Sequence, residues 1–125
     1  HRDLHSFPTR RSSDLEAQRR SLAVLASPEG ATGAAVDAAA REHVASRGFG
    51  ECFTHSTGHG IGLEIHELPL VNAANAERLL PGSVVTVEPG VYVEGLGGVR
   101  IEDSVLVADA GCEVLTSAPK ELLEL

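Results

Sequence analysis

Ser83-Val-Val-Thr-Val-Glu88 and Val99-Arg-Ile-Glu-Asp-Ser-Val-Leu-Val107 are the two stretches of sequence that decide the fold. Both are rich in β-branched residues and are bounded by turn residues, which is typical of strands. Leu80-Pro81-Gly82, ahead of the first stretch, predicts a type II turn, because proline presets one central angle and glycine accepts the positive φ of the next. The glycine-rich segment 94–98 predicts that the two stretches pair as antiparallel neighbours. A turn at 108–111 and one more strand complete the expected meander.

Two helices are expected before this β-rich half. Residues 16–26 are good helix formers, and Pro28-Glu29-Gly30 ends their pattern. A second helix is indicated by Thr32 as its N-cap, by apolar residues at four-residue spacing over 36–44, and by Gly48 as the left-handed residue after the last turn. We therefore expect an α+β fold, with helices packed on a mainly antiparallel, curved sheet.

The composition fits a single soluble domain. Of 125 residues 42% are hydrophobic, and the net charge of -8 repels the phosphates of nucleic acids. No run approaches the roughly 20 apolar residues that span a bilayer, and the amino terminus lacks the pattern of an export signal. The two cysteines, Cys52 and Cys112, form no CxxC pair, which suits a reducing compartment. We expect a cytoplasmic protein with neither nucleic-acid nor membrane partners.

Residues 1–15 look foreign to the rest of the chain. The stretch His5-Ser-Phe-Pro-Thr-Arg-Arg-Ser-Ser-Asp-Leu15 resembles the translation of a common sequencing-adapter oligonucleotide, and it has neither helical nor strand periodicity. A natural basic arm is the alternative, which the three arginines of residues 1–15 permit. We interpret residues 1–15 as non-native and residues 16–125 as one part of a longer domain whose upstream sequence has been lost.

Three histidines are concentrated in one short segment, Phe53-Thr-His-Ser-Thr-Gly-His-Gly-Ile-Gly-Leu-Glu-Ile-His66. His59 is flanked by glycines, which remove side-chain bulk and allow an imidazole to approach an ion or a substrate closely. A buried core imidazole explains a single histidine such as His43 better than it explains a cluster. A dinucleotide-binding loop is disfavoured because Ile65 stands where its third glycine belongs. Cys52 as a nucleophile is a minor alternative.

Two glutamates are expected to meet on the predicted sheet. If the two strands pair, Glu88 and Glu102 become cross-strand or diagonal neighbours, and like charges at that distance need a proton, a cation or a metal ion. Arg100 lies two residues from Glu102 and can orient a carboxylate. A simple Glu–Arg salt bridge therefore explains the spacing about as well as a metal site does.

Three motifs, in order along the chain, resemble one known family. Gly58-His-Gly-Ile-Gly-Leu-Glu-Ile-His-Glu67, Val87-Glu-Pro-Gly-Val-Tyr92 and Gly98-Val-Arg-Ile-Glu-Asp-Ser104 are similar to the motifs of Xaa-Pro aminopeptidases and prolidases. These enzymes are metallopeptidases with the pita-bread fold. The resemblance covers residues 16–125 and implies the C-terminal half of that fold.

The resemblance also implies a set of site residues. The family binds two divalent ions with two aspartates, one histidine and two glutamates, so that His59, Glu88 and Glu102 are the implied ligands. His55 and His66 match the histidines on the substrate side, Glu88 is also the implied proton acceptor, and Arg100 matches an arginine behind the ligands. The two aspartates belong to an earlier segment. Asp37 lies in a predicted helix, outside the aspartate motif, and is not assigned as a ligand.

The implied activity is hydrolysis of the peptide bond on the amino side of proline, with a peptide that has proline at its second position as the partner. Carboxylate-rich sites favour manganese, and the imidazole leaves room for cobalt or zinc. With three of five ligands present, we expect the chain alone to be inactive. A non-catalytic pita-bread module that binds peptides or proteins is the alternative, and a metal-free relative acting on small guanidino compounds is a more distant one. The resemblance leaves a homodimer of the full-length protein open.

Overall fold

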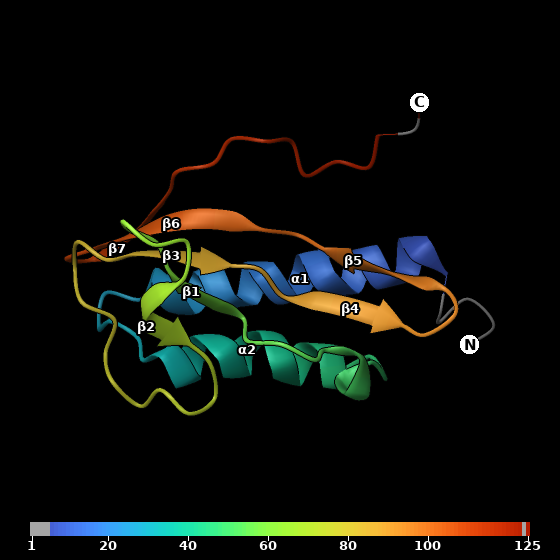
Figure 1. Ribbon diagram of the computed structural model, residues 1–125, viewed down its shortest axis with the longest axis horizontal. Coiled ribbons are helices and arrows are strands. Elements are labelled where there is room, and N and C mark those ends of the chain that lie inside the picture. The colour runs from blue at the N-terminus through green and yellow to red at the C-terminus, as the bar shows by residue number, and fades with distance from the viewer. Residues whose placement is uncertain (1–5, 124) are drawn as a thin grey trace.

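A computed structural model describes residues 6–123 and 125 of the chain, as two helices packed against antiparallel strands (Figure 1). The helices α1 (Phe7–Leu25) and α2 (Gly33–Ser46) run antiparallel to one another on one face of the sheet. The elements that follow are η1 (Gly50–Cys52), β1 (Gly58–Gly60), β2 (Glu67–Val71), β3 (Val84–Val87), β4 (Gly90–Val93), β5 (Gly97–Arg100), β6 (Asp103–Ala108) and β7 (Gly111–Val114). The expected α+β class is confirmed.

Local signals place helix α2 and the first turn as predicted. The Thr32 side chain accepts a hydrogen bond from the Ala35 amide at 3.0 Å, so it is the N-cap. Gly48, with φ of +85°, follows the last turn. Gly82 has φ of +91°, and the Ser83 amide donates to the Leu80 carbonyl at 3.1 Å, which closes the turn before β3.

Helix α1 begins earlier than the sequence predicts. Residues 7–15, for which no helix was expected, form its first half, with Ser6 as N-cap and a proline in the first turn. Residues 1–5 of the segment interpreted as non-native lie outside the described residues. Periodicity gave no signal because the inward face of this half is polar, with Ser13 and Asp14 buried.

The strands of the described residues form two sheets. One has five strands in the order β2-β1-β3-β6-β7, and the other is the β4-β5 hairpin; all neighbours are antiparallel. The expectation of one strand over 99–107 is wrong, because the chain leaves the ladder at Ile101 and Glu102. There the Ile101 amide donates to Asp14 Oδ2 at 2.8 Å, and its carbonyl accepts from Gln18 Nε2 at 3.4 Å. At this break the Ile101 backbone therefore forms hydrogen bonds with side chains of helix α1 instead of with a neighbouring strand.

Two apolar clusters hold the helices against the sheets. One joins the C-terminal end of α1 and the start of α2 to the five-stranded sheet and includes Val36, Val85 and Val105. The other lies under the β4-β5 hairpin and includes Val44 and Val91. In the described part of the chain, no helix combines the length and the apolar character that crossing a bilayer requires.

Candidate metal centre

One pocket is lined by the side chains that the family resemblance implied for the site, with the exception of His55. They come from β1, the loop before β2, the residue after β3, β5 and the β5-β6 break. The polar residues that line the pocket are His59, His66, Thr86, Glu88, Arg100 and Glu102. The three implied ligands, His59, Glu88 and Glu102, therefore face one space rather than separate regions of the molecule.

Glycines allow β1 to lie close to its two neighbours. A Cβ at Gly58 would stand 1.8 Å from the Thr86 carbonyl oxygen, and one at Gly60 would stand 2.3 Å from the Leu68 carbonyl oxygen. Both contacts are far below van der Waals distance. The glycines around His59 thus serve strand packing in this structure, and neither has a positive φ. The His59 amide then donates to Thr86 Oγ1 at 3.0 Å, which fixes the start of its side chain.

The contacts of the His59 ring define which of its nitrogens carries the proton. Its Nδ1 lies 2.9 Å from the Gly60 carbonyl oxygen, which can only accept, so Nδ1 carries the proton. In the neutral ring the lone pair is therefore on Nε2, and this atom lies 3.3 Å from Glu88 Oε2. Two lone pairs that face each other call for a proton or a cation between them.

The two glutamates are close enough to influence each other. The pKa of the Glu102 carboxyl is raised, first by burial and then by the negative charge of Glu88 and a hydrogen bond to it, and Arg100 opposes this rise. Arg100 Nε lies 3.8 Å from Glu102 Oε2, too far for a short hydrogen bond. The salt bridge that the sequence left open is thus present but long, and it leaves the negative charge of the pocket incompletely balanced.

The carboxylate and imidazole groups of the pocket suit a divalent cation, but they form only part of a complete set of ligands. Carboxylate oxygens with one imidazole nitrogen suit manganese and other hard or borderline ions. Within residues 6–123 and 125, however, no three His, Cys, Asp or Glu side chains are grouped tightly enough to hold an ion. His59 and Glu88 form a close pair, and Glu102 adjoins Glu88. Asp37 does not complete the set, because it lies outside the pocket and accepts hydrogen bonds from Arg41 and Thr57.

The other two histidines are placed differently. The His66 ring lies 4.4 Å from that of His59 at the pocket and is exposed. His55 lies outside the pocket, in a separate hollow beside Arg41 and Phe53. Its Nδ1 donates to the Ser56 carbonyl at 2.7 Å, so in the neutral ring its Nε2 accepts from the Tyr92 hydroxyl at 2.8 Å.

Tyr92 connects His55 to the pocket and was assigned no role from the sequence. Besides donating to His55, its oxygen is hydrogen-bonded by Arg100, which raises the pKa of the Arg100 guanidinium. Arg100 therefore donates to Tyr92, and Tyr92 in turn donates to His55. Tyr92 stands in a quoted motif, four residues after Glu88, so its position was visible in the sequence even though its partners were not.

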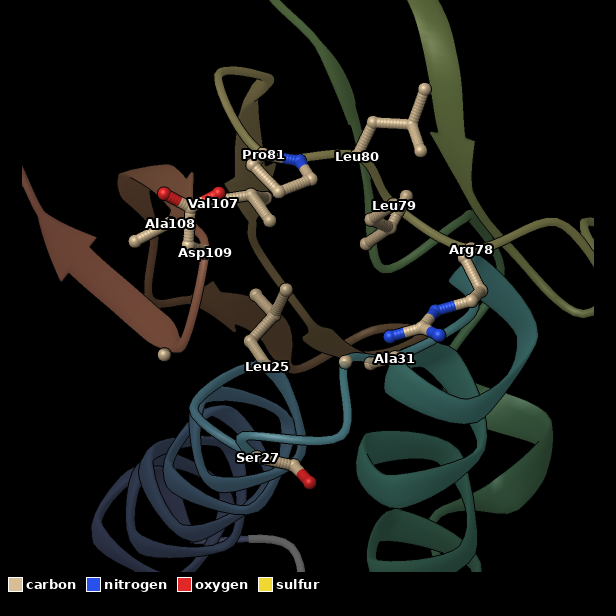
Figure 2. Close-up of a pocket in the computed structure, with 12 residues that line it drawn as sticks. Leu25, Ser27, Ala31, Arg78, Leu79, Leu80, Pro81, Val107, Ala108 and Asp109 are labelled. Carbon is tan, nitrogen blue, oxygen red and sulfur yellow. The ribbon is translucent and has the colours of Figure 1, made fainter.

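Another hollow lies at the opposite end of the five-stranded sheet, and its lining offers few chemically reactive groups. Figure 2 shows Leu25, Leu79 and Val107 pointing into it, with Arg78 at its edge. The Arg78 guanidinium is engaged with the Glu29 carbonyl. This hollow is an imperfectly filled end of the apolar core, so the pocket with His59 is the candidate site.

Comparison with known proteins agrees with this geometry. Residues 14–109 match the family model described as metallopeptidase family M24. The chain belongs to this family. Among relatives of the M24 chain, an Xaa-Pro dipeptidase from Pyrococcus furiosus is 49% identical over 109 residues, which make up 87% of this chain and 31% of that protein.

Solved structures show the same fold. An Xaa-Pro dipeptidase from Bacillus anthracis has a TM-score of 0.91 at 47% identity, covering 97% of this chain and 34% of that one. An X-Pro aminopeptidase from Thermotoga maritima has a TM-score of 0.88 at 44% identity, covering 94% and 33%. The expected family and the pita-bread fold of the M24 chain are confirmed. The chain spans about a third of the length of these relatives.

Proposed function

We propose that this M24 chain is the metal-binding part of a peptidase that hydrolyses the bond on the amino side of proline in a dipeptide or longer peptide. The observation that carries the proposal is the convergence of His59, Glu88 and Glu102 on one pocket, from three separate motifs. Two relatives, an Xaa-Pro dipeptidase and an X-Pro aminopeptidase, supply the substrate class.

The proposed ligands are His59 through Nε2 and the carboxylates of Glu88 and Glu102. They would hold two divalent ions, manganese first and cobalt or zinc as alternatives, together with two aspartates from the preceding part of the protein. Divalent ions at such a site, when bound, activate water at neutral pH and stabilise the negative oxygen of the attacked carbonyl.

The remaining roles belong to the chain's own side chains. Glu88 accepts the proton of the attacking water, because its carboxylate faces the pocket beside His59. His66, exposed at the pocket, donates a hydrogen bond to the developing oxyanion. Arg100 orients the Glu102 carboxylate by its positive charge. His55 acts on the site through Tyr92 and Arg100 rather than by direct contact.

The test uses the protein with its upstream coding sequence restored. We expect a protein that cleaves an Xaa-Pro dipeptide in the presence of Mn²⁺ and leaves the matching Xaa-Ala dipeptide intact. His59→Ala and Glu102→Gln should each lower kcat/KM by at least a hundredfold, as expected for loss of a metal ligand. Glu113→Gln is the matched control, because it removes an exposed carboxylate on β7, away from the pocket.

Two results would contradict the proposal. The first is equal turnover by Glu102→Gln and Glu113→Gln. The second is an upstream sequence in which other residues replace the two aspartates, which would favour the non-catalytic binding module. For the 125-residue chain alone we expect no turnover with Mn²⁺ and an Xaa-Pro dipeptide, because the set of ligands is partial. Robust turnover by the chain alone would refute this expectation.

A further inference from the structure

Gln18 joins the two segments that carry the glutamates. It lies on α1 with 1% of its surface exposed, beneath the five-stranded sheet. Its Nε2 lies 3.2 Å from the Val87 carbonyl oxygen and 3.4 Å from the Ile101 carbonyl oxygen. Each of these carbonyls belongs to the residue that directly precedes a glutamate of the pocket. A single amide group thus contacts the backbone just before Glu88 and just before Glu102.

A third contact fixes which way the amide points. Gln18 Nε2 also lies 3.0 Å from Asp103 Oδ2. Two carbonyls and a carboxylate oxygen surround this atom, and a carbonyl can only accept hydrogen bonds, so the atom must be the NH₂ nitrogen. The two hydrogens of the NH₂ group serve three acceptors, and no other orientation of the amide satisfies the two carbonyls.

Asp103 is itself held from the other side. Its Oδ1 accepts from Lys120 Nζ at 2.8 Å and from Thr116 Oγ1 at 2.6 Å, while Oδ2 faces Gln18. The carboxylate is 3% exposed and is therefore a paired internal charge, not a candidate ligand. This buried polar network ties α1, the end of β3 and the start of β6 to one point.

The network lies where the ladder alone cannot fix the glutamates. The β3-β6 register ends at the pair Val87 and Asp103, so Glu88 and Glu102 lie one step beyond the last paired residues. Beyond the ladder, the spacing of the two backbones depends on other contacts. The Glu88 amide donates to the Thr57 carbonyl at 2.7 Å, and on the Glu102 side the Ile101 backbone contacts Gln18 and Asp14 of α1.

We propose that Gln18 is a positioning residue that sets the separation of the Glu88 and Glu102 carboxylates and thereby the affinity of the pocket for a divalent cation. The inference rests on the proposed metal site. It extends that site to a helix residue that no motif contains.

The test compares substitutions at Gln18 with one on the same helix. Gln18→Met keeps the length and volume but removes both donors, and Gln18→Glu places a carboxylate against three acceptors. Ser21→Ala is the matched control, because Ser21 is also fully buried on α1 but its hydroxyl donates to the Val36 carbonyl of α2 at 2.7 Å, away from the glutamates. Each variant of the 125-residue chain is titrated with Mn²⁺ by electron paramagnetic resonance and unfolded with urea.

We expect Gln18→Met to weaken Mn²⁺ binding at least tenfold and Gln18→Glu to weaken it further. Ser21→Ala should lower the urea midpoint to a similar extent and leave the Mn²⁺ affinity within twofold. Amide hydrogen exchange should be faster at residues 87–88 and 101–103 in Gln18→Met, and faster only along α1 and α2 in Ser21→Ala.

The outcomes separate this inference from the proposed function. If Gln18→Met and Ser21→Ala change both Mn²⁺ affinity and local exchange alike, Gln18 has only a general structural role and the inference is overturned. If the unsubstituted chain binds no Mn²⁺, the metal affinity stated for the chain fails. The exchange rates at 87–88 and 101–103 then still decide whether Gln18 positions the two glutamate segments.

Discussion

Asp14 is an acidic residue whose buried surroundings disfavour its charged form. It is fully buried on α1, its Oδ2 accepts from the Ile101 amide, and its Oδ1 is buried with no hydrogen-bond partner in the part of the chain that the structure describes. Burial raises the pKa of Asp14 from its ordinary 3.8 to about 8, against a smaller lowering by that amide and by Arg100. The carboxyl is thus protonated over much of the neutral range.

This pKa determines the sign of the pH dependence. Between pH 4 and pH 8 the folded chain holds a proton on Asp14 that the unfolded chain has lost, so stability falls as pH rises, by up to about 1.4 kcal/mol per pH unit from this group. Asp14→Asn keeps the acceptor for Ile101 and removes the ionisation. We expect it to match the unsubstituted chain near pH 4 and to be clearly more stable near pH 8, as measured by urea unfolding at both values.

Glu16→Gln provides the control, since Glu16 is on the same helix but pairs with Arg20 at the surface. A stability difference for Asp14→Asn that is independent of pH would contradict the burial argument. A neighbouring residue bears on the origin of residues 1–15. The Ser13 hydroxyl is buried with no hydrogen-bond partner among the described residues, which fits a foreign sequence in a native helical position; this stays a prediction.

Among the elements, β1 depends most on the absence of side chains. It lies between β2 and β3, and at Gly58 the backbone of β3 occupies the space that a Cβ would need. We expect Gly58→Ala to force β1 away from β3, to lower the free energy of unfolding by roughly 3 kcal/mol, and to move His59 from Glu88. Urea unfolding measures the first effect, and the Mn²⁺ titration measures the second.

Gly50→Ala is the appropriate comparison for Gly58. Its added Cβ would meet the Ala45 side chain at 3.2 Å, a contact that small shifts relieve, so we expect a change within about 1 kcal/mol. Equal effects of the two substitutions would show that the glycine at 58 is not required by strand packing.

Local signals explain why some elements were predictable. Helix α2 has its own cap, periodicity and terminal glycine, and the turn at Pro81 and Gly82 is specified by two residues, so both were found from sequence. The break at Ile101 was not, because its cause is Asp14 and Gln18, more than eighty residues earlier in the chain. A strand propensity read over 99–107 contains no information about such partners.

In the candidate site too, some placements could be predicted from sequence and others depend on contacts with distant residues. His59, Glu88 and Glu102 line one pocket because their three motifs lie at the same side of the sheet. Strand alternation, together with the expected pairing of the two strands, predicted that Glu88 and Glu102 approach each other. The family resemblance implied that His55 lies on the substrate side of the same site. Its place outside the pocket depends on the Tyr92 hydroxyl, which is a tertiary contact.

At the scale of the whole molecule, several large apolar side chains are uncovered. Leu63, Ile65 and Leu68 are 106%, 77% and 78% exposed, and they lie on or next to β2, the edge strand of the five-stranded sheet. An edge strand with exposed leucines favours pairing with another chain. We therefore expect the 125-residue chain to self-associate at micromolar concentration, as measured by sedimentation velocity.

The edge strand β2 should be the main contact in that association. Leu68→Lys places a charge on this edge and should shift the sedimentation profile toward the monomer, because a lysine there opposes strand addition. Leu96→Lys is the control: Leu96 is also 58% exposed but lies in the β4-β5 turn. If both lysines reduce association equally, general apolar exposure is the cause, and β2 has no special role.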